Sequence, residues 1–132
     1  MIRADLIAPV PELIARQADT HPDKVAFRDA RMSVTYGELA RTTAALAAHF
    51  QTSGVALGER VAIFLPNSVA WIESCFAVTR AGAVGVPVSY DASLPELAYR
   101  LEDAGCTAIV TTDERAQQIA ELLASRPMKT VV

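Results

Sequence analysis

The chain has 132 residues, of which 52% are hydrophobic and 20% are charged, and its formal net charge is -3. This length and apolar content fit one folded domain and exclude a disordered chain, which would be more polar and more highly charged. Lysine and arginine are scattered singly along the sequence, without the basic stripe that a nucleic-acid backbone requires, so we expect no nucleic-acid partner.

The first half of the sequence predicts a helix, a hairpin and a longer helix. The corresponding ranges are about 11–20, 25–28, 32–35 and 36–53. Pro11 suits the first turn of a helix because its missing N–H group needs no partner there. Thr35 and Glu38 have the spacing of a capping box, which predicts that the longer helix starts at the next residue, and Gly54 is a typical stop signal.

The second half alternates strands and helices. Strands are predicted at about 60–65, 83–88, 107–111 and 129–132, with helices between them at about 68–81, 93–104 and 113–123. The first two strands are apolar at nearly every position, so we expect them to be buried. Right-handed crossovers then predict an α/β fold: a mostly parallel sheet with helices on its faces, plus the short N-terminal helix and hairpin.

Single residues predict further details of the helices. Ser93 and Glu96 repeat the capping-box spacing, and Asp113 is expected to cap the last helix. The helix at about 68–81 carries two adjoining apolar stripes, so we expect it to be buried on most sides. The inner stripe of the next helix is expected to consist of three leucines, Leu94, Leu97 and Leu101.

No motif for nucleotide binding or catalysis is found in the sequence. None of the six glycines forms the G-x-G-x-x-G of a dinucleotide turn or the G-K-[ST] ending of a P-loop. His21 and His49 have no partner at catalytic spacing, and the adjacent acidic pairs point in different directions on a helix. We therefore expect no catalytic, cofactor-binding or metal-binding residues in this chain.

The cysteines and the N-terminal segment bear on the compartment. Cys75 and Cys106 each lie in an apolar run instead of a C-x-x-C pair, so we expect buried, reduced thiols and no zinc site. The first 17 residues lack the apolar region and cleavage site of a signal peptide, and no run reaches the ~18 apolar residues of a membrane helix. A cytoplasmic protein without a membrane span is expected.

Three stretches of the sequence resemble one known family. They are SVTYGELA at 33–40, GERVAIFLPNSVAW at 58–71 and AGAVGVPVSYDASLPELAYRLEDAGCTAIVTT at 81–112. In this order they are similar to the T-Y-x-E-L, G-D-R-V-A-I, L-P-N-S, A-G-A-V and P-E-E-L-x-Y-R-L-x-D-x-G motifs of the adenylate-forming ligases. This AMP-binding superfamily comprises acyl-CoA and aryl-CoA synthetases, nonribosomal peptide adenylation domains and luciferases. The chain resembles its N-terminal portion.

The resemblance implies that residues 1–132 are a single partial domain, the incomplete N-terminal subdomain of the adenylate-forming fold. The parent ligase would use ATP and Mg²⁺ to form an acyl-adenylate from a carboxylic acid, and would pass the acyl group to a thiol of CoA or of carrier-protein phosphopantetheine. We expect these 132 residues to contain neither the family's phosphate loop nor its C-terminal domain, since neither lysine, Lys24 or Lys129, lies in a Ser/Thr/Gly-rich loop. We expect this piece alone to bind none of these cofactors and to be inactive, with the remainder of the ligase, in cis or as a split chain, as its partner.

One loop departs from the family pattern. Where many members have an asparagine-proline or a glycine pair, this chain has Ser89-Tyr90-Asp91. In members that use CoA this loop and the start of the later helix can lie near the CoA nucleotide, which would place Tyr90, Asp91 and Arg115 close to it. Because the motif does not match, that role is not assigned, and we expect a solvent-exposed turn after a strand.

An alternative function belongs to another class: a non-catalytic interaction or dimerisation module derived from the same fold. A sheet that stops at Val132 would expose strand edges and the apolar face of the helix at 69–81, and such surfaces often bind partners, including a second copy of the chain. The identity of the carboxylic acid, and the choice between CoA and a carrier-protein thiol, stay open at the level of the sequence.

Overall fold

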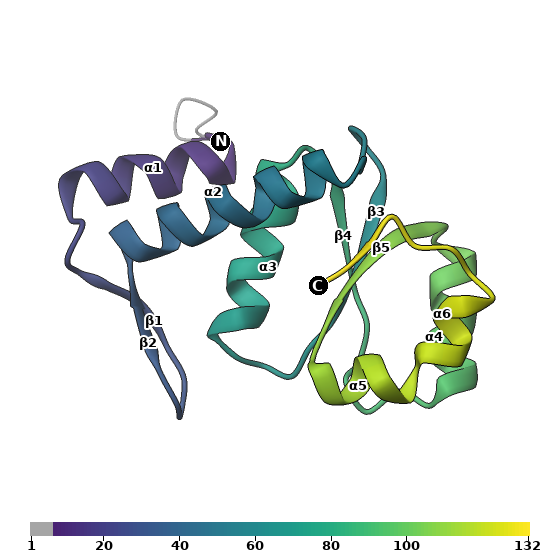
Figure 1. The fold of residues 1–132 in the computed structure, drawn as a ribbon. Coiled ribbons are helices and arrows are strands. Elements are labelled where there is room, and N and C mark those ends of the chain that lie inside the picture. Colours follow the sequence, from purple (N-terminus) through teal and green to yellow (C-terminus); the bar gives the residue numbers. More distant parts are fainter. Residues whose placement is uncertain (1–6) are drawn as a thin grey trace, which may run out of the picture.

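The computed structural model describes residues 7–132 (Figure 1). The helices are α1 Val10–Thr20, α2 Tyr36–Thr52, α3 Val69–Arg80, α4 Leu94–Asp103, α5 Asp113–Gln118 and α6 Ala120–Ala124. The strands are β1 Val25–Arg28, β2 Ser33–Thr35, β3 Arg60–Phe64, β4 Val84–Pro87, β5 Cys106–Thr111 and β6 Thr130–Val131. Residues 1–6, which belong to the segment that we expected to lack a signal peptide, lie outside the described residues.

Four strands form one parallel sheet in the order β4-β3-β5-β6. β3 is central: Val61 lies opposite Gly85 of β4 on one side and opposite Ala108 of β5 on the other. β1 and β2 pair separately as an antiparallel hairpin, with Arg28 opposite Ser33. The predicted α/β fold, with a parallel sheet and an N-terminal helix and hairpin, is confirmed.

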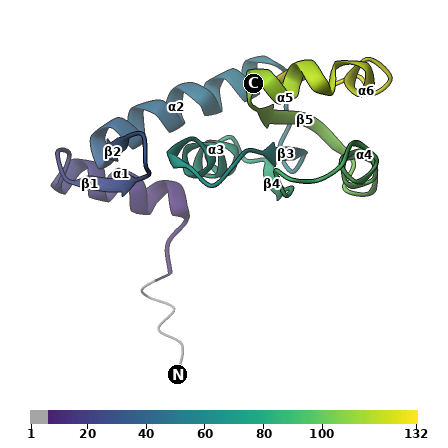
Figure 2. The ribbon, with the colours of Figure 1, turned by 90° about the horizontal axis from the view of Figure 1, so that it is seen from below.

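Helices cover both faces of this sheet (Figure 2). Val61 and Ile63 of β3 pack with α2 and α3, whereas Ala62 and Phe64 pack with α4, Ile119 and α6. None of these four side chains is more than 1% exposed, so β3 is buried on both faces, as predicted. α3 and α4 lie on opposite faces because the crossovers from β3 to β4 and from β4 to β5 run in opposite directions across the sheet.

A smaller apolar cluster attaches the hairpin to the first three helices. Its buried members come one each from α1, β2, α2 and α3, and are Ile14, Val34, Leu39 and Val69. The rings of Phe27 in β1 and Phe76 in α3 extend it, with their centroids 5.9 Å apart. The hairpin turn is thereby held beside the N-terminus of α3.

Side-chain caps start the helices close to the predicted positions. Thr35 Oγ1 accepts the Glu38 N–H at 3.2 Å and Glu38 Oε2 accepts the Thr35 N–H at 2.8 Å, which completes the predicted capping box of α2. This hydrogen bond from the Thr35 backbone lowers the pKa of the Glu38 carboxyl. Ser68 caps α3, one of the two residues predicted for this role.

The prediction that the second strand is buried is wrong. β4 lies at the edge of the sheet, and Val84, Gly85 and Pro87 are all exposed. The reason is the strand order, which a local sequence pattern does not report: β5 occupies the other side of β3, and no strand among the described residues pairs with the outer edge of β4. Its apolar residues therefore face one helix layer and solvent.

Three predicted details of the later helices also need correction. Leu97 and Leu101 are buried in the apolar cluster beneath α4. Leu94 is 45% exposed, because it is the first residue of α4 and does not belong to that cluster. Ser93 accepts the Glu96 N–H, yet no reciprocal bond from Glu96 is formed. Thr112, one residue before Asp113, caps the next helix.

The last helical segment is broken into α5 and α6 at Ile119. Ile119 has φ -100° and ψ 7°, and its side chain is fully buried in the cluster that contains Leu97 and Leu101. Burial of this side chain fixes a backbone angle that ends one helix and starts another. The sequence around the break contains neither glycine nor proline, so no local signal marked it.

The two cysteines are free and lie on opposite faces of the sheet, Cys75 beside the α2 and α3 cluster and Cys106 beside the α4 cluster. Both are half-buried and not fully buried as expected, and burial raises the pKa of each thiol. Within residues 7–132, no helix is long and apolar enough to cross a membrane.

Candidate functional site

A cleft with a volume of 400 Å³ lies at the carboxyl ends of β3 and β4. Its lining comes from the loop after β3, the first turn of α3 and the loop after β4, and consists of Leu65, Pro66, Asn67, Trp71, Pro87, Val88, Ser89, Tyr90 and Asp91. The chain leaves β3 toward one face of the sheet and leaves β4 toward the other. Ligands of open α/β sheets bind at such a switch point, outside the carboxyl ends of the strands.

The wall that follows β3 is fixed by backbone hydrogen bonds. Ser68 Oγ accepts the Trp71 N–H at 3.2 Å and donates to the Pro66 carbonyl at 2.9 Å. Asp29, from the hairpin turn, accepts the Val69 N–H at 2.9 Å. This bond, with two more from the backbone of the turn, lowers the pKa of the Asp29 carboxyl. Two N–H groups of the α3 N-terminus are therefore occupied within the protein.

The wall that follows β4 is built on Tyr90. Its hydroxyl lies 2.9 Å from Thr112 Oγ1, and its carbonyl accepts a hydrogen bond from Arg115 Nη2 at 2.7 Å. The Arg115 guanidinium carbon lies 4.9 Å from the Tyr90 ring centroid and 5.3 Å from that of Phe64. Residues from the ends of three strands thus meet at one point of the sheet.

The structure brings together two of the three residues that were considered from the sequence for this loop and the start of the later helix. Tyr90 and Arg115 are in direct contact, whereas Asp91 is exposed at the rim of the cleft. The expected solvent-exposed turn is correct for Ser89 and Asp91 and wrong for Tyr90, which is half-buried. Sequence reasoning missed Trp71 and Thr112 as neighbours of this loop. Their positions were the available signal: Thr112 directly follows β5 and Trp71 lies in the first turn of the helix after β3, and the carboxyl ends of parallel strands lie side by side.

The lining of the cleft offers a carboxylate, an amide, hydroxyls and an indole. It contains no lysine, arginine, histidine or cysteine. His49 lies elsewhere, with Nε2 2.9 Å from Thr130 Oγ1 of β6. Among residues 7–132, no group of three or more His, Cys, Asp or Glu side chains is placed to hold a metal ion. The arrangement suits binding by hydrogen bonds and aromatic stacking rather than covalent or acid-base chemistry.

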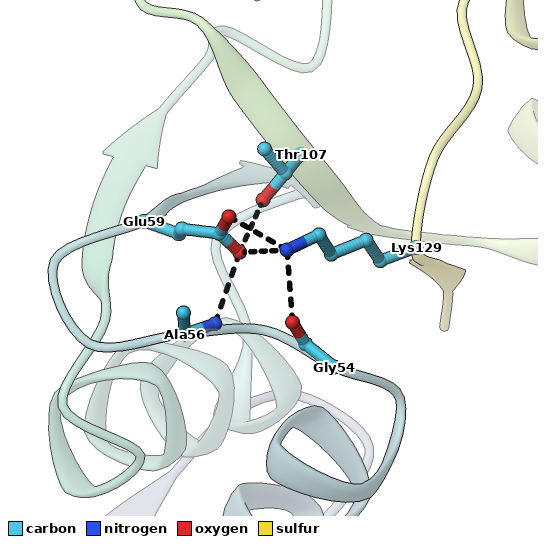
Figure 3. A network of polar contacts seen from close by, with 5 residues as sticks. All are labelled: Gly54, Ala56, Glu59, Thr107 and Lys129. Atoms are coloured by element: carbon cyan, nitrogen blue, oxygen red, sulfur yellow. Dashed lines mark hydrogen bonds and ion pairs between the residues drawn. The ribbon is translucent and has the colours of Figure 1, made fainter.

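A second polar network lies at the opposite, amino edge of the sheet (Figure 3). Lys129 Nζ donates to both carboxylate oxygens of Glu59, at 2.6 and 2.7 Å, and to the Gly54 carbonyl at 2.9 Å. Glu59 also accepts from the Ala56 N–H and the Thr107 hydroxyl. The bond from Lys129, followed by that from Ala56, lowers the pKa of the Glu59 carboxyl. One of the two lysines is thus used to attach β6.

The fold and the cleft define a doubly wound α/β protein with a candidate site at a switch point of its sheet. Residues 14–132 match the family described as AMP-binding enzyme. The chain belongs to this family, the adenylate-forming ligases, and corresponds to the N-terminal region of its members.

Individual relatives agree with this assignment. The chain is 39% identical over 114 residues to a feruloyl-CoA synthase of Amycolatopsis sp, a match that covers 86% of this chain and 23% of the relative. It is 34% identical over 110 residues to enterobactin synthase component F of Escherichia coli K12, covering 83% and 8%. The N-terminal subdomain of Klebsiella oxytoca NpsA in complex with 3-hydroxybenzoyl-AMSN is 30% identical with a TM-score of 0.74, covering 81% and 27%. The chain therefore spans about a quarter or less of these curated relatives.

Proposed function

We propose that the chain is the N-terminal piece of an ATP-dependent carboxylate ligase that forms an acyl-adenylate and passes the acyl group to a thiol of CoA or of a carrier protein. The observation that carries this proposal is the family match over residues 14–132. The feruloyl-CoA synthase relative makes CoA the first thiol to test and a hydroxycinnamic acid the first substrate. The cleft after β3 and β4 is the part of the site that this piece supplies.

The piece alone is proposed to be inactive. ATP–Mg²⁺ does not fit the cleft by itself, because its lining carries a carboxylate and no cation to oppose the phosphate charge. Val69 and Trp71 at the start of α3 already donate their N–H groups to Asp29 and Ser68, so those donors are not free for a phosphate. Lys129 is paired with Glu59 at the amino ends of the strands, on the side of the sheet away from the cleft. The remainder of the ligase must supply the phosphate-binding groups.

A segment exchange tests this function. Residues 14–132 replace the corresponding segment of the Amycolatopsis feruloyl-CoA synthase, and ferulate-dependent exchange between ATP and pyrophosphate is measured, followed by feruloyl-CoA formation. We expect the chimera to be active, the synthase without the segment to be inactive, and the isolated 132-residue chain to be inactive. The segment-deleted enzyme is the control for residual activity of the remaining three quarters or so of the synthase.

Two results would contradict the proposal. If circular dichroism shows that the chimera is folded and it nevertheless binds neither ferulate nor ATP, the proposed ligase function is refuted. Exchange activity in the isolated chain would show that a 132-residue piece carries its own phosphate-binding groups, and the claim of inactivity would be abandoned.

A second candidate function is an interaction or dimerisation module. It is favoured by an apolar groove of 310 Å³ between α1, the hairpin, α2 and α3, at whose edge Val10 and Leu13 are 39% and 42% exposed. Sedimentation equilibrium of the 132-residue chain distinguishes the two candidates. A concentration-independent monomer is expected for the ligase piece, and a stable dimer would support the module.

A further inference from the structure

Tyr90 is held by residues that lie across the central strand from its own loop. The loop follows β4, whereas Thr112 and Arg115 follow β5, and β3 lies between these two strands. The Tyr90 ring spans the end of β3, with its centroid 5.5 Å from that of Phe64. Hydroxyl, ring and carbonyl of Tyr90 each have a separate partner, so both the side chain and the backbone of this residue are fixed.

Arg115 contacts Tyr90 at two places, the carbonyl and the ring. Its Nη2 group donates to the Tyr90 carbonyl at 2.7 Å and its Nη1 group to Gln118 Oε1 at 3.1 Å, while the guanidinium plane lies over the two rings. Within residues 7–132, no carboxylate lies within ion-pair distance of Arg115. The guanidinium therefore interacts with the two aromatic rings and with one backbone carbonyl. These interactions fix the orientation of Tyr90 as well as its position.

The same loop forms one wall of the cleft. Val88 and Ala92 on either side of it are buried, and the Ala92 N–H closes a turn on the Ser89 carbonyl at 3.0 Å. Between these anchors Ser89 and Asp91 are exposed, and Tyr90 is the one residue of the three that is tied to the sheet. Across the cleft from this loop lies Trp71, the single tryptophan of the chain.

We propose that Arg115 is a positioning residue, which sets the shape of the cleft by fixing Tyr90 and with it the loop after β4. Its importance for catalysis rests on the ligase function proposed above, but its effect on the cleft does not. Release of the guanidinium frees the Tyr90 carbonyl, so that only the hydroxyl bond to Thr112 and the ring contact with Phe64 still hold the middle of this loop. The wall opposite Trp71 then opens more readily to solvent.

Fluorescence of Trp71 in the 132-residue chain tests the positioning role without any substrate. We expect Arg115→Gln to raise the acrylamide quenching constant of Trp71 about twofold, because loss of the loop's contacts increases local opening. Arg115→Lys keeps the positive charge and loses the planar fork, so its quenching constant is expected between those of Arg115→Gln and the unchanged chain. Arg100→Gln is the matched control, since Arg100 is an exposed residue of α4 paired with Glu96, and it should leave quenching unchanged.

An unchanged quenching constant in a folded Arg115→Gln variant overturns the proposal. If that variant unfolds, Arg115→Lys decides the question by the same measurement. Unfolding of both variants also overturns the proposal, because Arg115 would then stabilise the domain as a whole instead of placing one loop.

The chimeric synthase supplies a second readout. There we expect Arg115→Gln to raise the KM of at least one substrate about fivefold while kcat stays within about twofold, because a wall that is no longer fixed weakens binding more than chemistry. A fall in kcat with unchanged KM would contradict this. An inactive chimera before any substitution would count against the ligase function alone, since the quenching result does not depend on it.

Discussion

Lys129 Nζ lies 2.6 Å from Glu59 Oε1, and this ion pair joins segments 70 residues apart at the amino edge of the sheet. It attaches β6, whose pairing with β5 continues through the Thr111 N–H, which donates to the Val132 carbonyl at 2.8 Å. The side chains of Lys129 and Glu59 are 38% and 26% exposed, so solvent weakens the pair without removing it.

Lys129→Gln should therefore loosen β6 more than the rest of the fold. The melting temperature is expected to fall by a few degrees at most, because an exposed ion pair contributes little to global stability. Hydrogen exchange at the Thr111 amide should become clearly faster, since its acceptor, the Val132 carbonyl, directly follows β6. Arg16→Gln, which removes the exposed Glu12–Arg16 pair on α1, is the control and should not alter exchange at Thr111. Equal rates of hydrogen exchange at the Thr111 amide in both variants would show that the Lys129–Glu59 pair does not hold β6.

Acid should destabilise the fold through Asp29, Glu38 and Glu59. Hydrogen bonds from backbone or lysine groups lower the pKa of each carboxyl in the folded state. The unfolded chain then binds more protons, so the stabilisation is complete above the unfolded pKa and is lost as pH falls through the lower folded pKa. We expect the urea midpoint to decrease steadily below about pH 4.5.

Asp29→Asn tests the share of one carboxylate in this pH dependence. The amide oxygen can still accept as Oδ1 now does from Arg31 and Met32, but an NH2 group replaces the oxygen that accepts the Val69 N–H, and the negative charge is gone. The variant should be less stable at neutral pH and should lose less stability on acidification than the unchanged chain. Asp19→Asn, at an exposed position of α1, is the comparison. If the urea midpoint of Asp29→Asn falls with decreasing pH as steeply as that of the unchanged chain, Asp29 does not contribute to the acid sensitivity.

Gly105→Ala should destabilise the chain more than Gly54→Ala. Both glycines have positive φ, 61° and 89°, which costs a side-chain residue about 1–2 kcal/mol. At Gly54 an added Cβ meets nothing within 4 Å, but at Gly105 it lies 2.9 Å from Arg60 Nη2. Displacing Arg60 strains its 2.7 Å bond to the Ala104 carbonyl. Urea unfolding of the two variants measures the difference, and equal losses would show that the contact with Arg60 is immaterial.

Pro87 limits pairing at the free edge of β4. The N–H groups of Val84 and Val88 donate to the carbonyls of Glu59, just before β3, and Ile63. The alternate positions, Gly85 and Pro87, therefore face the open edge, and proline has no N–H to offer there. Pro87→Val should restore a donor and increase self-association, measured by sedimentation velocity at increasing concentration. Val84→Thr leaves the edge donors unchanged and is the control. A Pro87→Val variant that stays as monomeric as the control would exclude this edge as a route to dimers.

Features that depend on neighbouring residues were predictable from the sequence. Thr35 with Glu38, and Ser68 before an apolar run, act within one helical turn, and the structure places both caps as expected. The exposure of Val84 was not predictable in this way. It depends on β5, a later strand, which pairs with β3 on the side away from β4 and so leaves β4 at the edge of the sheet.

The candidate site was predictable only in part for the same reason. Tyr90 and Arg115 are 25 residues apart and meet because two loops end at one edge of the sheet, a relationship that strand order decides. Thr112 could be expected at this edge from its place after β5, but its bond to Tyr90 depends on the side-chain packing over Phe64. The family motifs located the loops without defining their contacts.

The central place of β3 also sets an order of events during synthesis. Both of its pairing partners, β4 and β5, follow it in the chain, so the apolar segment Val61–Leu65 leaves the ribosome before any strand can cover it. Pairing with β5 must wait until α3, β4 and α4 have been made, and such non-local pairing is slow. This interval is the point at which the nascent chain is most exposed to aggregation, and a chaperone that binds extended apolar segments would act there.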